Sequence, residues 1–308
     1  MSGSGMSSTT SPVLPTSASS AQPLLTPTEQ LMYSAVRLFN QVGQTLHWGS
    51  GFLFHLFNMN GQSVPVIVTN KHVVNGWDNC SFELAARNPD GSPDLSTHVP
   101  VTITDFQKAF VPHPSIDLAA IPVGRILSDL QHQNRAAFTI GLDPSLIPTD
   151  DELAQLLPVE QVLTVGFPGM LWDDLHNLPV FHRGYTSTAP YIDFKGEKKF
   201  LIDVATWPGA SGSPVFLFND NGWTDRHGNT MLGATRIKLI GVVYGVGLQT
   251  IDGNILIQNA PTQVVVPGQM VVPTNLGACI RASCILDFEP LLVRLGIKPP
   301  AGYIMRAK

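Results

Sequence analysis

The sequence predicts an all-β protein organised as a sandwich or a barrel. Hydrophobic residues make up 44% of the 308 residues and charged residues only 13%, a balance typical of chains rich in buried strands and poor in solvated helices. Most apolar segments have the length of a strand, and Gly, Pro and Asn separate nearly all of them, which argues against a parallel sheet. All-β barrels commonly reach about 200–250 residues in a single domain, so the chain can form one globular unit.

The chain opens with a segment, residues 1–28, that is rich in Ser, Thr and Pro. It has no basic start and no apolar run long enough for a signal peptide or a membrane span. We therefore expect a disordered tail, in which residues 1–5 resemble a remnant of an expression vector. The expected strands then follow at residues 34–39, 51–57, 64–69, 99–106, 118–123, 161–167, 199–204, 214–218, 237–246, 263–266 and 279–286.

One stretch, residues 124–160, interrupts this series of strands. It contains an expected short helix that begins after Thr149, and it would connect two halves that are both rich in strands. The expected organisation is an N-terminal barrel over residues 29–125, an inter-barrel connection over 126–160, and a C-terminal barrel over 161–308. A short helix near residues 289–295 would close the last unit.

The seven residues Pro208-Gly209-Ala210-Ser211-Gly212-Ser213-Pro214 carry the strongest chemical signal. Two glycines that flank a serine permit a positive φ and the close approach of a substrate backbone, so this turn can expose a nucleophilic hydroxyl. The backbone N–H groups of Gly209 and Ser211 would then converge on a developing oxyanion. An ordinary Gly/Ser turn between two strands is the competing interpretation, so the rest of the chain has to decide between the two.

Two residues that a serine nucleophile needs lie upstream of this turn. The apolar run that includes Val66 ends near His72, and Asp117 lies at the start of another apolar run, so His, Asp and Ser follow one another in this order. That order belongs to the two-barrel β proteases. The nucleophile elbow of the α/β-hydrolases is excluded, because Ser213 stands where that motif has a glycine and no histidine follows His227.

Several sequence blocks, in the correct order, resemble the chymotrypsin-like, or trypsin-like, serine peptidase family, and in particular its bacterial members without disulfides. The resemblance covers about residues 30–290 and implies two β-barrels with the active site in the cleft between them. The blocks that carry it are Gly49-Ser50-Gly51-Phe52, Thr69 to Val74, Asp117-Leu118-Ala119, Val165-Gly166-Phe167-Pro168 and Gly209 to Pro214.

The resemblance implies a serine endopeptidase that acts through a triad of His72, Asp117 and Ser211 and an acyl-enzyme intermediate. A serine hydroxyl is a weak nucleophile and needs a base within hydrogen-bond reach. A histidine can take the hydroxyl proton and return it to the leaving amine, while a carboxylate fixes the tautomer of the ring. The alternatives that remain open are His113 for the base and Asp105 or Asp94 for the acid.

Two positions distinguish the chain from the digestive trypsins that it resembles. Ala210 stands where those enzymes have an aspartate that pairs with a newly cut N-terminus, so activation by cleavage is not expected. Ala205, six residues before the nucleophile, stands where they have an acid at the base of the specificity pocket, which disfavours cleavage after Lys or Arg. We therefore expect a neutral, apolar P1 side chain, and Arg281 would approach the pocket only if its strand shifted by one residue. The remaining residues expected to contact substrate are Val243, Tyr244 and Gly245.

The composition limits the classes of binding partner and the cellular compartments that we expect. The net charge of −5 gives no reason to expect nucleic acid, no Cys/His cluster has metal spacing, and no cofactor or membrane contact is expected. The three cysteines are an odd number without framework spacing, which favours a reducing compartment and a cytoplasmic protein. The expected partner is a protein or peptide substrate. Because a free protease inside a cell is hazardous, we also expect a narrow substrate range or gating by a regulatory protein partner.

Two other functions remain open at this stage. A catalytically inactive binding or scaffold protein would keep the barrels but usually loses a member of the triad, and this sequence keeps a candidate for all three. An esterase would use the same residues as a peptidase, and the fold alone does not separate those two activities.

Overall fold

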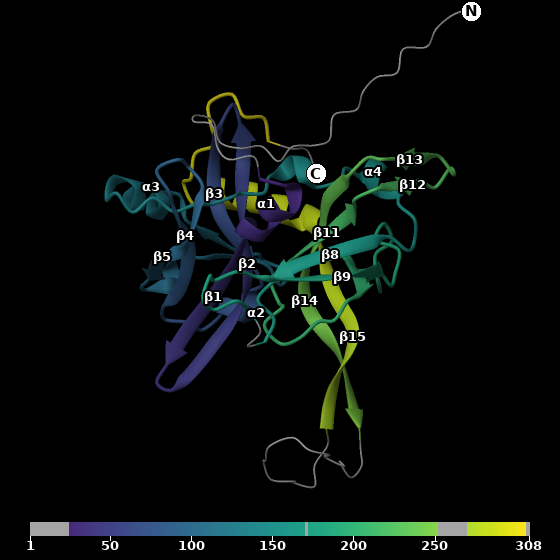
Figure 1. Ribbon diagram of the computed structural model, residues 1–308, viewed down its shortest axis with the longest axis horizontal. Helices are drawn as coiled ribbons and strands as arrows, with labels where there is room; N and C mark the ends of the chain where they lie inside the picture. Colours follow the sequence, from purple (N-terminus) through teal and green to yellow (C-terminus); the bar gives the residue numbers. More distant parts are fainter. Residues whose placement is uncertain (1–24, 170–171, 252–269, 306–308) are drawn as a thin grey trace, which may run out of the picture.

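The computed structural model of the protein describes residues 25–169, 172–251 and 270–305. Its strands form two β-structures, one from each half of the chain, which lie side by side in Figure 1. The expected all-β fold is thereby confirmed. The strand expected at residues 263–266 lies outside the described residues.

The sequence predicts a barrel over residues 29–125, but the first half of the chain forms a seven-stranded antiparallel sheet with the strand order β5-β4-β1-β2-β3-β7-β6. Its central strands alternate between the two sides of the sheet, and in β2 nearly every side chain after Trp48 is buried because both sides are covered. The elements of this half are α1 (Pro27–Ser34), β1 (Ala35–Val42), β2 (Thr45–Met59), β3 (Gln62–Thr69), α2 (Lys71–Val74), β4 (Cys80–Arg87), β5 (Pro93–Ile103), β6 (Val111–Pro112) and β7 (Ala119–Pro122).

The second half forms a closed barrel with the strand order β10-β15-β14-β11-β8-β9. Its two longest strands, β14 and β15, continue past the barrel as a two-stranded ribbon, which is seen at the bottom of Figure 1. The barrel strands are β8 (Gln161–Gly166), β9 (Val180–Thr186), β10 (Lys199–Asp203), β11 (Pro214–Asn219), β14 (Arg236–Ile251) and β15 (Met270–Arg281), and a separate hairpin consists of β12 (Gly222–Thr224) and β13 (Thr230–Leu232).

Short helices connect these units. The helix expected after Thr149 is present as α4 (Asp150–Ala154), because the Thr149 hydroxyl accepts from the amide of Glu152 while the Glu152 carboxylate accepts from the amide of Thr149, a reciprocal capping box. The helix expected near the C-terminus is α5 (Phe288–Arg294). The other helices are α3 (Gly124–His132) and three 3₁₀ segments at Phe106–Lys108, Pro144–Leu146 and Ala282–Asp287.

One hydrophobic core is shared by the two halves. Phe52 and Phe54 of β2 belong to the same buried cluster as Val165 of β8, Phe216 of β11 and Phe288 of α5. Each of these five side chains is at most 1% exposed. A closely packed interior has low compressibility. Residues that face each other across the junction of the two halves therefore keep a fixed geometry.

The structure corrects several local expectations. The expected strand at 99–106 is β5, which runs from Pro93 to Ile103. Strands β4 and β9, and the short strands β6, β12 and β13, have no counterpart among the expected strands. Strand β4 contains Glu83 and two alanines, and β9 fully buries only its last residue, Thr186. The expected strand at 279–286 ends at Arg281, and the following residues form a 3₁₀ segment instead. Ala282 and Ile285 are both buried, and three residues are the period that brings side chains of a 3₁₀ helix onto one face.

Candidate active site

His72 and Asp117 are joined by two hydrogen bonds. The ring Nδ1 of His72 lies 2.6 Å from Oδ2 of Asp117, and the His72 amide donates to Oδ1 at 3.0 Å. A carboxylate only accepts hydrogen bonds, so Nδ1 carries a proton, and in the neutral ring the Nε2 atom then has a lone pair. Burial raises the pKa of Asp117, but the two hydrogen bonds from His72 outweigh it and hold that pKa below its ordinary value.

The loop that carries Asp117 is fixed by His113. The His113 ring is buried, and its Nδ1 atom accepts from the backbone amides of Ser115 and Ile116 at 3.3 and 3.0 Å. The Nε2 atom of His113 lies 3.3 Å from Oδ2 of Asp287. The Lys71 ammonium donates to the backbone carbonyl of His113 at 2.9 Å. The structure therefore gives this alternative base a role in holding the loop and does not bring it to Ser211.

The two alternative acids make no hydrogen bond to His72. Asp94 accepts from the amide and the hydroxyl of Ser96, at 2.8 and 2.7 Å, in a local turn. Asp105 takes a left-handed conformation, with φ of 50°, at the start of a 3₁₀ helix. Among the three candidate acids, only Asp117 bonds to the His72 ring.

Ser211 lies on a turn whose two glycines both have a positive φ, +93° at Gly209 and +89° at Gly212. The turn is pinned to the barrel, because the Gly212 amide donates to the Val243 carbonyl at 2.8 Å and the Val243 amide donates to the Ser213 carbonyl at 2.9 Å. A side chain could not replace the hydrogen of Gly212, since a Cβ atom there would lie 1.9 Å from the carbonyl oxygen of Ser50.

The amides of Gly209 and Ser211 donate no hydrogen bond within the part of the chain that the structure describes. The Pro208 carbonyl accepts from the amide of Gly169. In a trans peptide the carbonyl and the following N–H point in opposite directions, so this bond turns the Gly209 N–H away from Gly169. Two neighbouring backbone donors thus remain available beside the Ser211 hydroxyl, as the sequence motif predicts for an oxyanion site.

Ser50, at the start of the buried part of β2, connects the first sheet to this turn. Its hydroxyl donates to the Gly209 carbonyl and accepts from the Phe167 amide, both at 2.9 Å. Its amide donates to the Ser211 carbonyl at 2.9 Å, and its carbonyl accepts from the Thr69 hydroxyl at 2.7 Å. Ser50 is fully buried, so every one of these polar groups depends on its protein partner.

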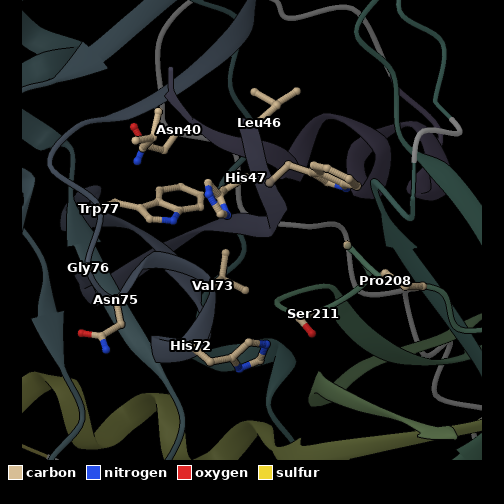
Figure 2. Close-up of a pocket in the computed structure, with 13 residues that line it drawn as sticks. Asn40, Leu46, His47, His72, Val73, Asn75, Gly76, Trp77, Pro208 and Ser211 are labelled. Carbon is tan, nitrogen blue, oxygen red and sulfur yellow. The ribbon is translucent and has the colours of Figure 1, made fainter. Parts of the chain in front are cut away.

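Ser211 and His72 line the same cleft, which has a volume of about 570 Å³ and is shown in Figure 2. The side chain of Ser211 makes no hydrogen bond to the His72 ring in this structure, and catalytic hydrogen bonds are often long before substrate binds. The other lining residues come mainly from the β1–β2 hairpin and from the loop after α2, and they include His47, Trp48 and Trp77. None of these three residues is predicted from the sequence to have a role, although both tryptophans flank the motif blocks around Ser50 and His72.

The residues expected to contact substrate occupy three different environments. Ala205 is exposed after β10, while Tyr244 and Gly245 are half-buried on β14. Val243 departs from the expectation, because its side chain is fully buried and its amide and carbonyl are both bonded to the nucleophile turn. Arg281, on β15, lies opposite Gly241 of β14, and its guanidinium pairs with the Asp193 carboxylate at 2.9 Å. The shift of its strand that would bring Arg281 to the pocket has therefore not occurred.

The described residues contain no cluster of three or more His, Cys, Asp or Glu side chains that could hold a metal ion. They also contain no helix that is both long and apolar enough to cross a membrane.

The sequence matches the family of trypsin-like peptidase domains over residues 49–222, which is more than half of the chain and includes His72, Asp117 and Ser211. The chain belongs to the trypsin-like peptidase family. The resemblance seen in the motif blocks is thereby confirmed, and the family falls in the class of serine endopeptidases that the order of the motifs predicts. No curated protein shows significant similarity to this trypsin-like peptidase chain.

Solved structures of other proteins superpose on this trypsin-like peptidase with low identity. An HtrA-type protease bound to a tripeptide has a TM-score of 0.45 and 14% identity, covering 87% of this chain and 62% of its own. A serine endoprotease from Yersinia pestis has a TM-score of 0.45 and 14% identity, covering 89% and 69%. An inactive mutant form of a Mycobacterium tuberculosis protein has a TM-score of 0.42 and 15% identity, covering 93% and 100%. The chain thus spans less than two thirds of the HtrA-type protein.

Replacing Ser50 by alanine tests its connection to the nucleophile turn. Ser50→Ala leaves the buried Phe167 amide without its acceptor and the Gly209 carbonyl without its donor, and an unsatisfied buried group costs about 1–3 kcal/mol. We expect the free energy of unfolding in urea to fall by about that amount, together with a slower reaction of Ser211 with a fluorophosphonate. Ser81→Ala, which removes an exposed hydroxyl bonded to Thr102, is the control, and equal effects of the two substitutions would contradict a special role for Ser50.

Proposed function

We propose that this trypsin-like peptidase hydrolyses peptide bonds through Ser211, His72 and Asp117. The observation that carries the proposal is the His72–Asp117 hydrogen bond beside a serine whose own amide, like that of Gly209, is left without a partner among the described residues. The lone pair on Nε2 of His72 takes the Ser211 proton as the hydroxyl oxygen attacks the scissile carbonyl. The two free amides then stabilise the oxyanion of the tetrahedral intermediate.

The next step, which completes acylation, reverses the direction of proton transfer. The His72 imidazolium gives its proton to the leaving amine, so the C–N bond breaks and an acyl ester on Ser211 remains. Water then attacks the ester with His72 as the base, and His72 returns this proton to the Ser211 oxygen as the ester C–O bond breaks and the carboxylic acid product leaves. Asp117 stabilises the imidazolium and holds the ring in place throughout, and its lowered pKa supports a carboxylate that stays ionised at neutral pH.

For specificity we propose a neutral, apolar P1 side chain. The support is that Ala205, at the expected pocket base, is uncharged, and that the half-buried Tyr244 and Gly245 are uncharged as well. Val243 supports the nucleophile turn in this proposal and does not touch substrate.

We also propose a narrow substrate range or gating by a partner in a reducing, cytoplasmic setting, in keeping with three cysteines that are all free and buried. Broad digestion of casein by the purified chain would contradict the narrow range.

Labelling with a fluorescent fluorophosphonate tests the proposed function, because this probe needs an activated serine next to an oxyanion site. We expect the purified chain to be labelled on Ser211, as located by mass spectrometry, and the label to disappear in Ser211→Ala and in His72→Ala. His132→Ala, at the exposed end of α3, is the control and should label normally. A folded chain that takes no label would contradict a triad that is active without a partner, and it would leave either a partner-gated site or an inactive binding protein.

A further inference from the structure

We propose that Asp287 is a positioning residue for Asp117 and acts on it through His113. Asp287 ends the 3₁₀ segment Ala282–Asp287 and lies outside all the motif blocks. The proposal rests on the proposed function, since it takes Asp117 as the carboxylate that orients His72. In this proposal the C-terminal segment of the second half helps to place a triad member that belongs to the first half.

The loop that carries Asp117 connects β6 to β7 and is folded around the side chain of His113. The His113 amide donates to the Leu118 carbonyl at 2.9 Å and closes the loop. Inside it, Nδ1 of the His113 ring accepts from the amides of Ser115 and Ile116 at 3.3 and 3.0 Å. The backbone that leads to Asp117 thus depends on the position of one ring, and a shift of this ring would shift the carboxylate.

The two amide bonds decide where the His113 ring carries its proton. An amide N–H only donates, so the Nδ1 atom that receives two of them must present a lone pair. In a neutral imidazole the other nitrogen then carries the hydrogen, and this nitrogen, Nε2, lies 3.3 Å from Oδ2 of Asp287. A carboxylate that accepts from one ring nitrogen fixes the tautomer. Asp287 therefore favours the one form of the ring that can hold both amides.

The His113 ring is poorly placed to replace Asp287 by water. It is 5% exposed, and the fully buried Phe288 packs edge-on against it with 5.8 Å between the ring centroids. A buried N–H group without an acceptor is costly. Without the carboxylate, the ring is free to turn or to carry its proton on Nδ1, and either change releases the two loop amides.

The C-terminal segment holds Asp287 in a fixed place relative to the first half. Phe288, the next residue, belongs to the core that the two halves share. Glu289 is 1% exposed, and its carboxylate accepts from the Phe57 amide of β2 at 3.1 Å. Asp287 is the N-cap residue of α5, but its side chain makes no capping hydrogen bond, so a substitution there leaves the helix end unchanged.

The rate at which a fluorophosphonate labels Ser211 in the purified full chain tests the proposal. Asp287→Ala should slow labelling by about 10-fold or more, since a shift of about 1 Å at a catalytic group costs about 10²-fold in rate. Asp287→Asn, whose amide oxygen can still accept from Nε2, should restore a rate close to that of the wild type. Asp220→Ala removes an exposed carboxylate that lies 3.3 Å from Arg183, and this control should label normally.

His113→Asn separates an effect through the ring from any other effect of Asp287, which also lines a cleft with Lys198 and Arg294. The asparagine oxygen can accept from the same loop amides, as in an Asx turn, but nothing in this side chain reaches Asp287. We expect His113→Asn to label at nearly the wild-type rate, and Asp287→Ala to cause no further loss in this background. Equal slowing by Asp287→Ala in both backgrounds would overturn the proposal.

Hydrogen–deuterium exchange of the peptide that contains residues 113–118 reports on the loop without relying on activity. Exchange should be faster in Asp287→Ala than in the wild type or in Asp287→Asn, because the amides of Ser115 and Ile116 lose their acceptor. Unchanged exchange in folded Asp287→Ala would overturn the proposal, whatever the labelling shows. A wild type that takes no label would instead count against the proposed function, and the exchange result would still decide the role of Asp287.

Discussion

Asp117→Asn is expected to lower kcat for peptide hydrolysis by about 10⁴-fold with the fold intact. The two carboxylate oxygens of Asp117 accept from the His72 amide and from Nδ1 of its ring. An asparagine has only one oxygen, and when this oxygen accepts from the amide, its NH₂ group faces Nδ1. The ring must then carry its proton on Nε2, and it can no longer accept the proton of Ser211. The measurement is kcat together with a thermal melting curve.

Asp94→Asn is the control for this prediction, because Asp94 accepts hydrogen bonds from Ser96 in a local turn and makes none to His72. Its kcat should equal that of the wild type. Full activity of Asp117→Asn, with a normal melting curve, would show that Asp117 does not orient the base, and the triad proposed here would then be wrong.

The same carboxylate should leave a signature in the pH dependence of stability. The pKa of Asp117 in the folded protein lies below the ordinary value of 3.8, so the ionised form stabilises the fold above that pH. This contribution is lost as the pH falls through the folded-state pKa. Between pH 5 and pH 2, wild-type stability in urea should therefore decline more than that of Asp117→Asn. Parallel curves for the two proteins would contradict a lowered pKa.

The sequence was sufficient to predict the parts of the site that lie within short motifs. The turn around Ser211, with its two glycines, is a local feature, and the chain order of His72, Asp117 and Ser211 pointed to one fold among those that use such a triad. The structure brings His72 and Asp117 into contact across 45 residues of sequence. That contact could be anticipated because each residue adjoins a buried strand, β3 or β7, and these two strands pair.

The supporting residues could not be predicted in the same way. The hydroxyl of Ser50 reaches Gly209 across 159 positions of sequence, and nothing local to its motif specifies that partner. Val243 was expected to contact substrate because it lies on the strand after the nucleophile, yet a register difference of one residue decides whether a strand position faces the cleft or the core. The β4 strand was missed because residues such as Ala85 and Glu83 have low strand propensity, and tertiary packing overrides it.

Gly212→Ala is expected to reduce both activity and stability more than an alanine at an equally strained glycine elsewhere. Position 212 combines a φ of +89° with a Cβ atom that would lie 1.9 Å from the Ser50 carbonyl oxygen and 2.6 Å from the Thr69 hydroxyl. Ser50 is fully buried and cannot move away, so the turn itself must shift. A displacement of about 1 Å at a catalytic group costs about 10²-fold in rate, and we expect at least that loss of fluorophosphonate reactivity.

Gly91→Ala separates the steric effect from the backbone effect. Gly91 has nearly the same φ, +88°, but a Cβ atom there meets nothing within 4 Å. This control should lose only about 1–2 kcal/mol of unfolding free energy in urea, the cost of a left-handed alanine, and should keep full reactivity of Ser211. A larger loss in Gly212→Ala is the steric contribution, because the two variants share the same backbone strain. If both variants behaved alike, close packing between the β2 strand and the nucleophile turn would not be what positions Ser211.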